Sequence, residues 1–278
     1  MLMRVDLHIH SSYSDGSLSP AEILPLAAAR GLSIVSITDH DTITHLPESI
    51  REAAHSGLTL IPGVEFTSGF SGREIHILGY ALNWRNGRLR EHLKIVQKRR
   101  IKRARAIIEA LNRHNIRVPL SRLEDLPPGQ TVGRVFIARL LIEYGYVRTM
   151  NEAFNRYLGQ NGAAFVPYEL TDAREVIALI AECGGISVFA HPSLQEFESM
   201  ACALRRMGLM GAEVYSPRLT PAESRTLELK AGELGLVTSG GSDWHYDSGR
   251  CKLGDFYLDT GQIHAFLDLA GVPLNNGT

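Results

Sequence analysis

Apolar and polar residues alternate along the first stretch of the chain. Apolar side chains at positions 5, 7 and 9 alternate with Asp6, His8 and His10, which is the two-residue period of a strand. His8 and His10 should therefore face the same side. A single strand histidine is commonly a packed core residue, but two imidazoles on one face indicate a metal site when further His, Asp and Glu residues end later strands.

Most of the chain repeats an apolar strand followed by an amphipathic helix. Capping boxes at Ser19 and Thr220 start two of the helices, each with Pro at the first helical position and Glu at the third. We expect further strands at 33–38, 58–64, 74–82, 186–190, 211–215 and 236–239, and helices at 44–56, 172–183 (with Thr171 as N-cap), 195–207 and 221–234. Seven such strands imply parallel pairing with right-handed crossovers, as in a barrel or a doubly wound sheet.

Polar residues recur where these strands end. His40 lies between two aspartates after the second strand, Glu65 follows the third, His191 the fifth, and Asp243 and His245 the seventh. A barrel brings all of these ends to one rim, whereas an open sheet gathers only those near its switch point. We therefore predict an α/β fold, a distorted seven-stranded (β/α) TIM-like barrel.

The pattern changes between residues 84 and 165, where helices at 87–115, 134–144 and 149–158 follow one another without a strand. We expect a barrel of residues 1–83 and 166–278 with an inserted helical subdomain of residues 84–165. From Arg85 to Arg156 the chain has 17 lysines and arginines against 6 acids, a net charge of +11 that leaves −12 elsewhere. Such an insert suits an anionic substrate, a phosphate ester or nucleic acid, unless it is only a solvated arginine-rich face.

The candidate metal ligands are all nitrogen or oxygen donors: His8, His10, Asp15, His40, Glu65, His76, His191, Asp243 and His245. They are too many for one ion and suit two or three divalent ions, with Glu65 as the bridging carboxylate. Without thiolates we expect manganese first, with zinc or iron as alternatives. Asp39 and Asp41 should orient ligand histidines. The remaining histidines should be ordinary surface or helix residues: His45, His55, His92, His114 and His264.

The chain shows no apolar run of transmembrane length and no signal-peptide layout. We therefore expect a soluble, cytoplasmic protein with no membrane partner. No obligate protein partner is visible either, and the end of the chain, 275–278, should be a loose tail.

A series of short motifs, in order from residue 4 to about 246, resembles the polymerase and histidinol phosphatase (PHP) family. The motifs are His8-Ile9-His10, Tyr13-Ser14-Asp15-Gly16, Thr38-Asp39-His40-Asp41, Gly63-Val64-Glu65, His76, Ala190-His191-Pro192 and Ser242-Asp243-Trp244-His245. The resemblance implies a trinuclear site. It assigns His8, His10, Glu65 and Asp243 to one metal, Asp15, His40 and His245 to a second, and Glu65, His76 and His191 to a third.

Within that family the insert looks like the subgroup acting on nucleoside 3',5'-bisphosphates and short 5'-phosphorylated RNA. The segments that carry this likeness are Gly133-Arg134, residues 138–141, 145–147, 153–154, 157–159 and 165–167. The resemblance implies that Arg134, Arg99 and Lys102 bind substrate phosphates, since guanidinium groups suit phosphate oxygens. On the helix, Arg99 and Lys102 share a face with Arg103. Arg218, after the sixth strand, could also reach the rim.

The expected activity is removal of the 3'-phosphate of a nucleoside 3',5'-bisphosphate, a small-molecule nucleotide, by an activated water. His191 or His245 would protonate the leaving oxygen, and Asp243 is the third candidate catalytic residue. A 5'-3' exoribonuclease on short RNA is the nearest alternative and could share the site. A histidinol phosphatase, whose substrate is a small monophosphate, would not need an insert with a net charge of +11. An amidohydrolase, which acts on C–N or C–O bonds, would not explain that charge either. A non-catalytic RNA-binding module leaves the metal ligands unexplained.

Overall fold

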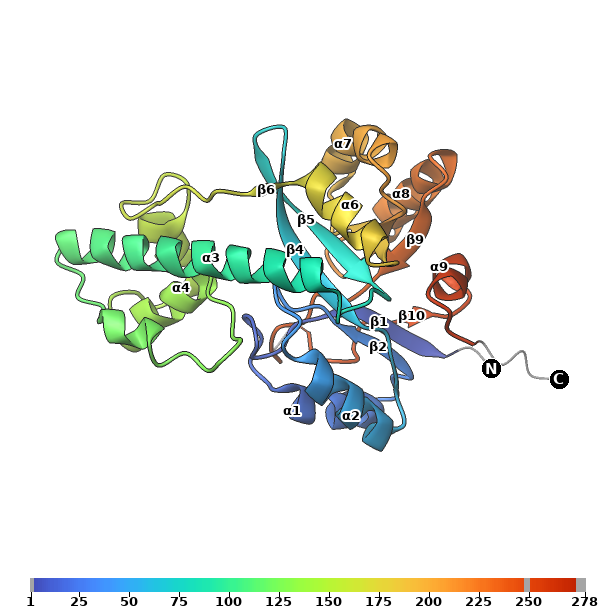
Figure 1. Cartoon of the computed structure of the whole chain (residues 1–278), viewed down its shortest axis with the longest axis horizontal. Helices are drawn as coiled ribbons and strands as arrows, with labels where there is room; N and C mark the ends of the chain where they lie inside the picture. The colour runs from blue at the N-terminus through green and yellow to red at the C-terminus, as the bar shows by residue number, and fades with distance from the viewer. Residues whose placement is uncertain (1–2, 248–250, 274–278) are drawn as a thin grey trace. The chain divides into compact units, whose positions relative to one another are not determined.

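The computed structural model describes residues 3–247 and 251–273, so the expected tail at 275–278 lies outside the described residues. Its strands are β1 (Arg4–Ile9), β2 (Ile34–Ile37), β3 (Thr59–Leu60), β4 (Gly63–Phe70), β5 (Arg73–Tyr80), β6 (Thr171–Asp172), β7 (Ile186–Phe189), β8 (Gly211–Tyr215), β9 (Val237–Gly240) and β10 (Leu258–Asp259). They form one sheet of order β10-β1-β2-β3 and a second of order β6-β4-β5-β7-β8-β9 (Figure 1).

The two sheets share a core. Val5 and Leu7 of β1 pack in one buried cluster with Leu78 of β5 and Val188 of β7. The hydroxyl of Tyr80 donates a hydrogen bond of 2.9 Å to the carbonyl oxygen of Leu7. Isolated parallel bridges, His40 with Glu65 and Ile9 with Trp244, join the sheets near the ends of β2 and β1. The expected α/β architecture is confirmed, with its strands in two sheets that meet around one core.

The expectation that the strands are all parallel is wrong at β5, which is antiparallel to both β4 and β7. β4 and β5 form a hairpin whose two turn residues, Ser71 and Gly72, have positive φ angles of 50° and 76°. Two-residue turns of this kind match the twist of paired strands. Because β4 runs through to Phe70, Glu65 lies inside this strand instead of following a strand that ends at residue 64.

Helices flank both sheets. The chain forms α1 (Pro20–Ala29), α2 (Leu46–Ser56), α6 (Ala173–Glu182), α7 (Leu194–Arg206), α8 (Pro221–Glu233) and α9 (His264–Leu269) (Figure 1). The capping boxes at Ser19 and Thr220 are confirmed, and Ser193 forms another at the start of α7. Asp172, not Thr171, caps α6, because Thr171 pairs with Ser68 in β6.

The chain divides into two compact units, of which the second is Glu91–Glu169. α3 (Gly87–Arg113) runs into this unit, followed by a 3-10 turn (Leu120–Leu123), α4 (Arg134–Glu143), α5 (Met150–Ala153) and a π-helical turn (Phe154–Leu158). The helix expected at 149–158 is therefore split. The unit has its own apolar core around Ile108, Leu111 and Leu141. No helix within residues 3–247 and 251–273 is long and apolar enough to cross a membrane.

Candidate metal centre

One oxygen of Glu65 faces His8, in β1, and His10, which directly follows this strand. Its Oε2 lies 3.3 Å from His8 Nε2 and 3.2 Å from His10 Nε2. The same two nitrogens lie 3.5 Å and 3.2 Å from Oδ1 of Asp243. All four side chains are almost completely buried. The structure therefore brings together the four residues assigned to the first metal.

The other oxygen of Glu65 faces two more histidines. His76 lies in β5, and His191 follows the end of β7. Its Oε1 lies 2.7 Å from His76 Nδ1 and 3.0 Å from His191 Nε2. These are the residues assigned to the third metal. Glu65 thus directs one oxygen to each of two clusters, which is the geometry expected of a bridging carboxylate.

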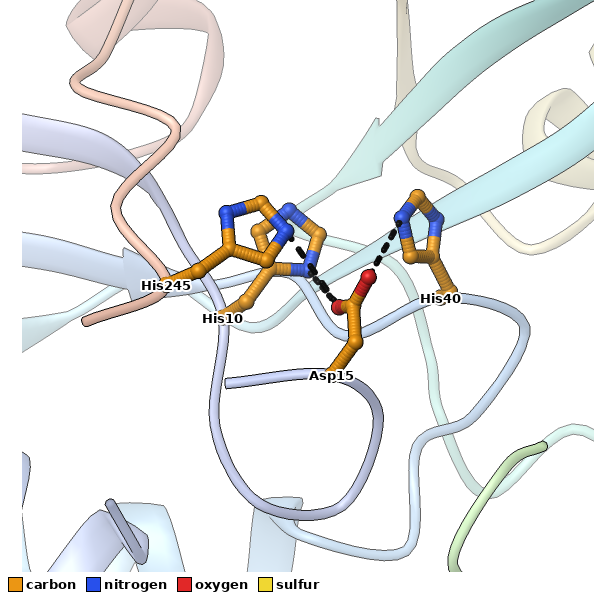
Figure 2. Close-up of side chains that lie close together, drawn as sticks. All are labelled: His10, Asp15, His40 and His245. Carbon is orange, nitrogen blue, oxygen red and sulfur yellow. Dashed lines mark ion pairs between the residues drawn. The ribbon is translucent and has the colours of Figure 1, made fainter. Parts of the chain in front are cut away.

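The carboxylate of Asp15 lies among three imidazoles, as Figure 2 shows. Its Oδ1 lies 3.3 Å from His245 Nε2 and 3.5 Å from His10 Nδ1, and its Oδ2 lies 3.8 Å from His40 Nε2. The rings of His10 and His245 stack with centroids 4.1 Å apart. The residues assigned to the second metal therefore lie together, with His10 turned toward them through its second nitrogen.

These side chains are arranged to bind divalent cations more than to form hydrogen bonds with one another. His8 Nε2 and His10 Nε2 lie 3.0 Å apart, so at most one can donate to the other. His40 Nδ1 lies 3.1 Å from Glu65 Oε2, yet this buried atom makes no hydrogen bond. Nitrogen and oxygen atoms that converge on one point in this way suit a common ion. Imidazole and carboxylate donors without thiolates are typical of manganese, zinc or non-haem iron.

Charge in the cluster supports the same conclusion. Burial raises the pKa of Glu65, but the imidazoles of His40, His76 and His8 outweigh it and hold that pKa well below its usual range. Burial lowers the pKa of His10, but Asp243 and Glu65 raise it to about 10. Without a cation, a proton on His10 thus offsets part of the negative charge of the buried carboxylates. A divalent ion would supply positive charge and displace that proton.

Local backbone geometry sets the positions of these ligands. His191 and Asp243 have φ angles of 34° and 53°, in the left-handed region that non-glycine residues rarely adopt. Gly241 lies against His8, so that a Cβ there would come within 2.4 Å of its backbone nitrogen. A Cβ at Gly16 would come within 2.2 Å of the His10 carbonyl oxygen. The backbone therefore turns sharply at these strand ends, and the turns direct the ligand side chains into one cluster.

The aspartates next to His40 hold the loops around the ligands, and Asp39 also reaches a ligand ring through Ser14, whose hydroxyl lies 3.4 Å from His10 Nδ1. Asp39 accepts hydrogen bonds from the amide and hydroxyl of Ser11 and from the hydroxyl of Ser14. Asp41 accepts one from the amide of Thr67. For Asp39 the expected link to a ligand histidine therefore runs through Ser14, and for Asp41 it stays a prediction. They hold the loop that carries Asp15 and the strand that carries Glu65.

We expect His45 to be an ordinary surface or helix residue; it does lie at the start of a helix, but it is not on the surface. It is completely buried at the start of α2. Its Nδ1 lies 3.0 Å from the hydroxyl of Ser49, and its Nε2 lies 3.9 Å from Asp39 Oδ2. Burial lowers the pKa of His45 and favours a neutral ring.

The sequence reading missed two buried acids that contact the site. Glu213 of β8 lies 3.0 Å from His8 Nδ1, and Asp6 accepts hydrogen bonds from the amides of His8 and Ser242. Burial raises the pKa of Asp6 to about 6. The sequence did carry a signal for Glu213, namely a charged residue inside the apolar strand Gly211–Tyr215. Because carboxylates are rarely buried without partners, this residue could have been predicted to contact a polar site.

The predicted substrate-binding residues lie in two parts of the chain. Arg218 pairs with Asp243, so it lies at the metal centre. The other three belong to the helical unit, where Arg99 pairs with Glu169 at 3.2 Å, Lys102 is exposed, and the Arg134 guanidinium lies 5.8 Å from the centre of the Phe154 ring. Their role in binding substrate stays a prediction.

Known proteins resemble this chain over most of its length. A 5'-3' exoribonuclease of Haemophilus influenzae is 34% identical over 91% of this chain and 94% of its own. A 3',5'-nucleoside bisphosphate phosphatase of Chromobacterium violaceum is 30% identical over 88% of both chains. The crystal structure of an amidohydrolase from Chromobacterium violaceum, with bound sulfate and no metal, is 30% identical, covers 87% of both chains and has a TM-score of 0.80.

The family match is consistent with the geometry of the site. Residues 6–165 match the PHP domain, a span that begins in β1 and includes six of the nine candidate ligands, from His8 to His76. The remaining three, His191, Asp243 and His245, come from the later strands and complete the same clusters. The chain therefore belongs to the PHP domain family.

Proposed function

We propose that this protein is a metal-dependent phosphatase that removes the 3'-phosphate of nucleoside 3',5'-bisphosphates and leaves nucleoside 5'-monophosphates. The observation that carries the proposal is the set of three donor clusters, which share His10 and His40 and lie around the carboxylate of Glu65. The Chromobacterium violaceum phosphatase, similar over 88% of this chain, supports the substrate class. Sulfate in the related crystal structure supports a tetrahedral oxyanion as ligand.

A second activity, 5'-3' exonuclease cleavage of short 5'-phosphorylated RNA, is supported by the Haemophilus influenzae relative. The two substrates share their reacting atoms. In each, phosphorus is esterified to O3' of a nucleotide that carries a 5'-phosphate, and cleavage of the P–O3' bond releases a nucleoside 5'-monophosphate. They differ only in whether the phosphorus also carries the next nucleotide. One site can therefore serve both.

Manganese is the metal we propose, with zinc and iron as the alternatives. His8, His10, Glu65 and Asp243 would hold one ion; Asp15, His40 and His245 a second; and Glu65, His76 and His191 a third. When bound, such ions neutralise charge on phosphoryl oxygens and lower the pKa of water.

Side chains of the site would transfer the proton that the leaving oxygen needs. Water gives up a proton and adds to phosphorus, the P–O3' bond breaks, and O3' takes a proton, so the number of protons is unchanged. His191 and His245 are our candidates for delivering it, because each ring is 23% exposed while His8 and His10 are fully buried. Asp243, close to His245, would hold that imidazole in place.

Cationic side chains would bind the substrate phosphates. Arg218 is the candidate at the metal centre, where its guanidinium already pairs with a carboxylate. From the helical unit we propose Arg134, Arg99 and Lys102. Guanidinium groups bind phosphate oxygens in pairs, and lysine adds a point charge. A 5'-phosphate gives the enzyme an anion to recognise that is separate from the phosphorus it attacks.

The test is phosphate release from 3',5'-bisphosphoadenosine by manganese-loaded protein, beside a 5'-phosphorylated RNA trimer and histidinol phosphate. We expect turnover of the bisphosphate, or of it and the trimer, that is abolished by a chelator and restored by manganese. His10→Ala and Asp243→Asn should remove this activity. Full metal-dependent turnover in either variant would overturn the proposed site.

The other substrates distinguish the remaining activities. Preference for histidinol phosphate would keep the metal centre and refute the nucleotide substrate. Salt-sensitive RNA binding without turnover, unchanged by chelator, would indicate a binding module. Hydrolysis of C–N or carboxylic ester substrates in place of phosphoesters would indicate an amidohydrolase.

A further inference from the structure

Glu213 is a charged residue in the middle of the buried strand β8. It is 1% exposed, and its neighbours in the strand are apolar. Taking a carboxylate out of water costs several kcal/mol unless donors surround it. Its partners should therefore show why the charge is there.

Both partners of Glu213 belong to the metal centre. Its Oε1 and Oε2 lie 3.0 Å and 3.2 Å from His8 Nδ1, and its Oε2 accepts a hydrogen bond of 2.7 Å from the backbone amide of His191. The amide can only donate. A carboxylate, which only accepts, can satisfy this amide and an Nδ1–H of His8 at the same time.

The contact with His8 determines which ring nitrogen carries the hydrogen. With the proton on Nδ1, the lone pair of Nε2 is directed toward the point where Nε2 meets His10 and Glu65. With the other tautomer, a hydrogen would occupy that point and exclude an ion. Carboxylate partners fix ligand histidines in this way at many metal sites.

The contact with His191 acts on the backbone. His191 has a φ angle of 34°, and the hydrogen bond from its amide to Glu213 stabilises this unfavourable conformation. That backbone places His191 Nε2 3.0 Å from Glu65 Oε1. His8 faces Oε2 of the same carboxylate. Glu213 therefore holds one ligand on each side of Glu65.

We propose that Glu213 is a positioning residue that sets metal affinity in two clusters at once, through the tautomer of His8 and the backbone of His191. The inference rests on the metal centre of the proposed function but not on which phosphoester is cleaved. Its experiments therefore use metal without substrate.

The first experiment is binding of Mn2+ to Glu213→Gln, by equilibrium dialysis with metal analysis. The amide keeps the shape but offers one acceptor and an NH₂ group that opposes a donor. We expect affinity to fall about 10- to 100-fold, with the metal-induced rise in melting temperature reduced and activity recovered at high Mn2+. Glu228→Gln, on α8, should bind metal as the wild type does.

A purely structural role predicts a different result. The metal-free variant would then melt earlier while its Mn2+ affinity stayed that of the wild type, and this would overturn the proposal. If the variant does not fold, the tautomer of His8 in the wild-type protein tests the proposal instead. In zinc-loaded, ¹⁵N-histidine-labelled protein, we expect His8 to show Nδ1–H and a metal-bound Nε2; the reverse assignment would refute the inference.

Discussion

The two units of the chain deal with charge in opposite ways. Among the described residues of the larger unit, six carboxylate side chains are almost completely buried: Asp6, Asp39, Asp41, Glu65, Glu213 and Asp243. Within residues 91–169, all of them described, Thr131 is the one buried polar residue, and a net charge of +7 lies around an apolar core. Buried acids with convergent histidines suit cations, whereas exposed cations suit phosphate. The difference predicts that metal binding and substrate binding can be damaged separately.

The largest effect should come from Glu65→Gln. The amide removes a donor oxygen and a negative charge between two clusters, so we expect turnover to fall by about 1,000-fold or more, which is about 4 kcal/mol of transition-state stabilisation. Steady-state phosphate release and bound metal per chain would measure it. Glu182→Gln, an exposed acid of the same unit that pairs with Arg88, is the control. Wild-type metal content in the Glu65 variant would contradict the bridging role.

The next effect should be confined to the helical unit. Ile108→Ala removes a fully buried side chain from its core and should cost about 2–5 kcal/mol of folding free energy. Denaturant unfolding would measure the loss, with Ile101→Ala, 42% exposed on the same helix, as a nearly neutral control. We expect metal content to be unchanged. Loss of metal together with the core would show that the two units do not behave separately.

Arg134→Ala should weaken substrate recognition without touching the metals. Loss of one charge-assisted hydrogen bond is worth about 1.5–3 kcal/mol, so kcat/KM for the bisphosphate should fall about 10- to 100-fold. Arg117→Ala removes an exposed charge from the same unit and is the matched control. An equal loss in both variants would mean that general positive charge, not a specific contact, binds the substrate.

The smallest effect should come from the surface pair Arg122 and Glu143. The guanidinium hydrogen bond lowers the pKa of the Glu143 carboxyl below its ordinary 4.5. Its stabilising contribution is thus present above about pH 4.5 and is lost as the pH falls through the lowered pKa of the folded state. Glu143→Gln should behave like Glu109→Gln, an exposed acid on α3, in thermal unfolding at pH 7. A clear difference would show that surface charge stabilises this unit.

Local sequence patterns were enough to predict much of the metal centre. The alternation around His8 and His10 places both rings on one face, and their Nε2 atoms indeed lie 3.0 Å apart. The apolar spacing of the strands and the capping residues predicted most helices to within a residue or two. These features depend on short-range geometry, which a single sequence carries.

Other features depend on partners far away along the chain. Glu213 contacts His8 across 205 residues, and no periodicity links them. The hairpin at Ser71 and Gly72 makes β4 and β5 antiparallel where parallel strands were expected, and this pairing depends on two backbone angles. His45 is buried because Asp39 and the start of α2 enclose it. Such residues become visible only when tertiary contacts are known.

The two oxygens of Glu65 also imply that its metals do not bind independently. An ion on the side of His8 would fix the orientation and charge of a carboxylate whose other oxygen faces His76. By thermodynamic linkage, an ion at either position changes the affinity of the other by the same factor. The two positions should therefore not fill independently, and a titration with metal should depart from the curve of independent single sites.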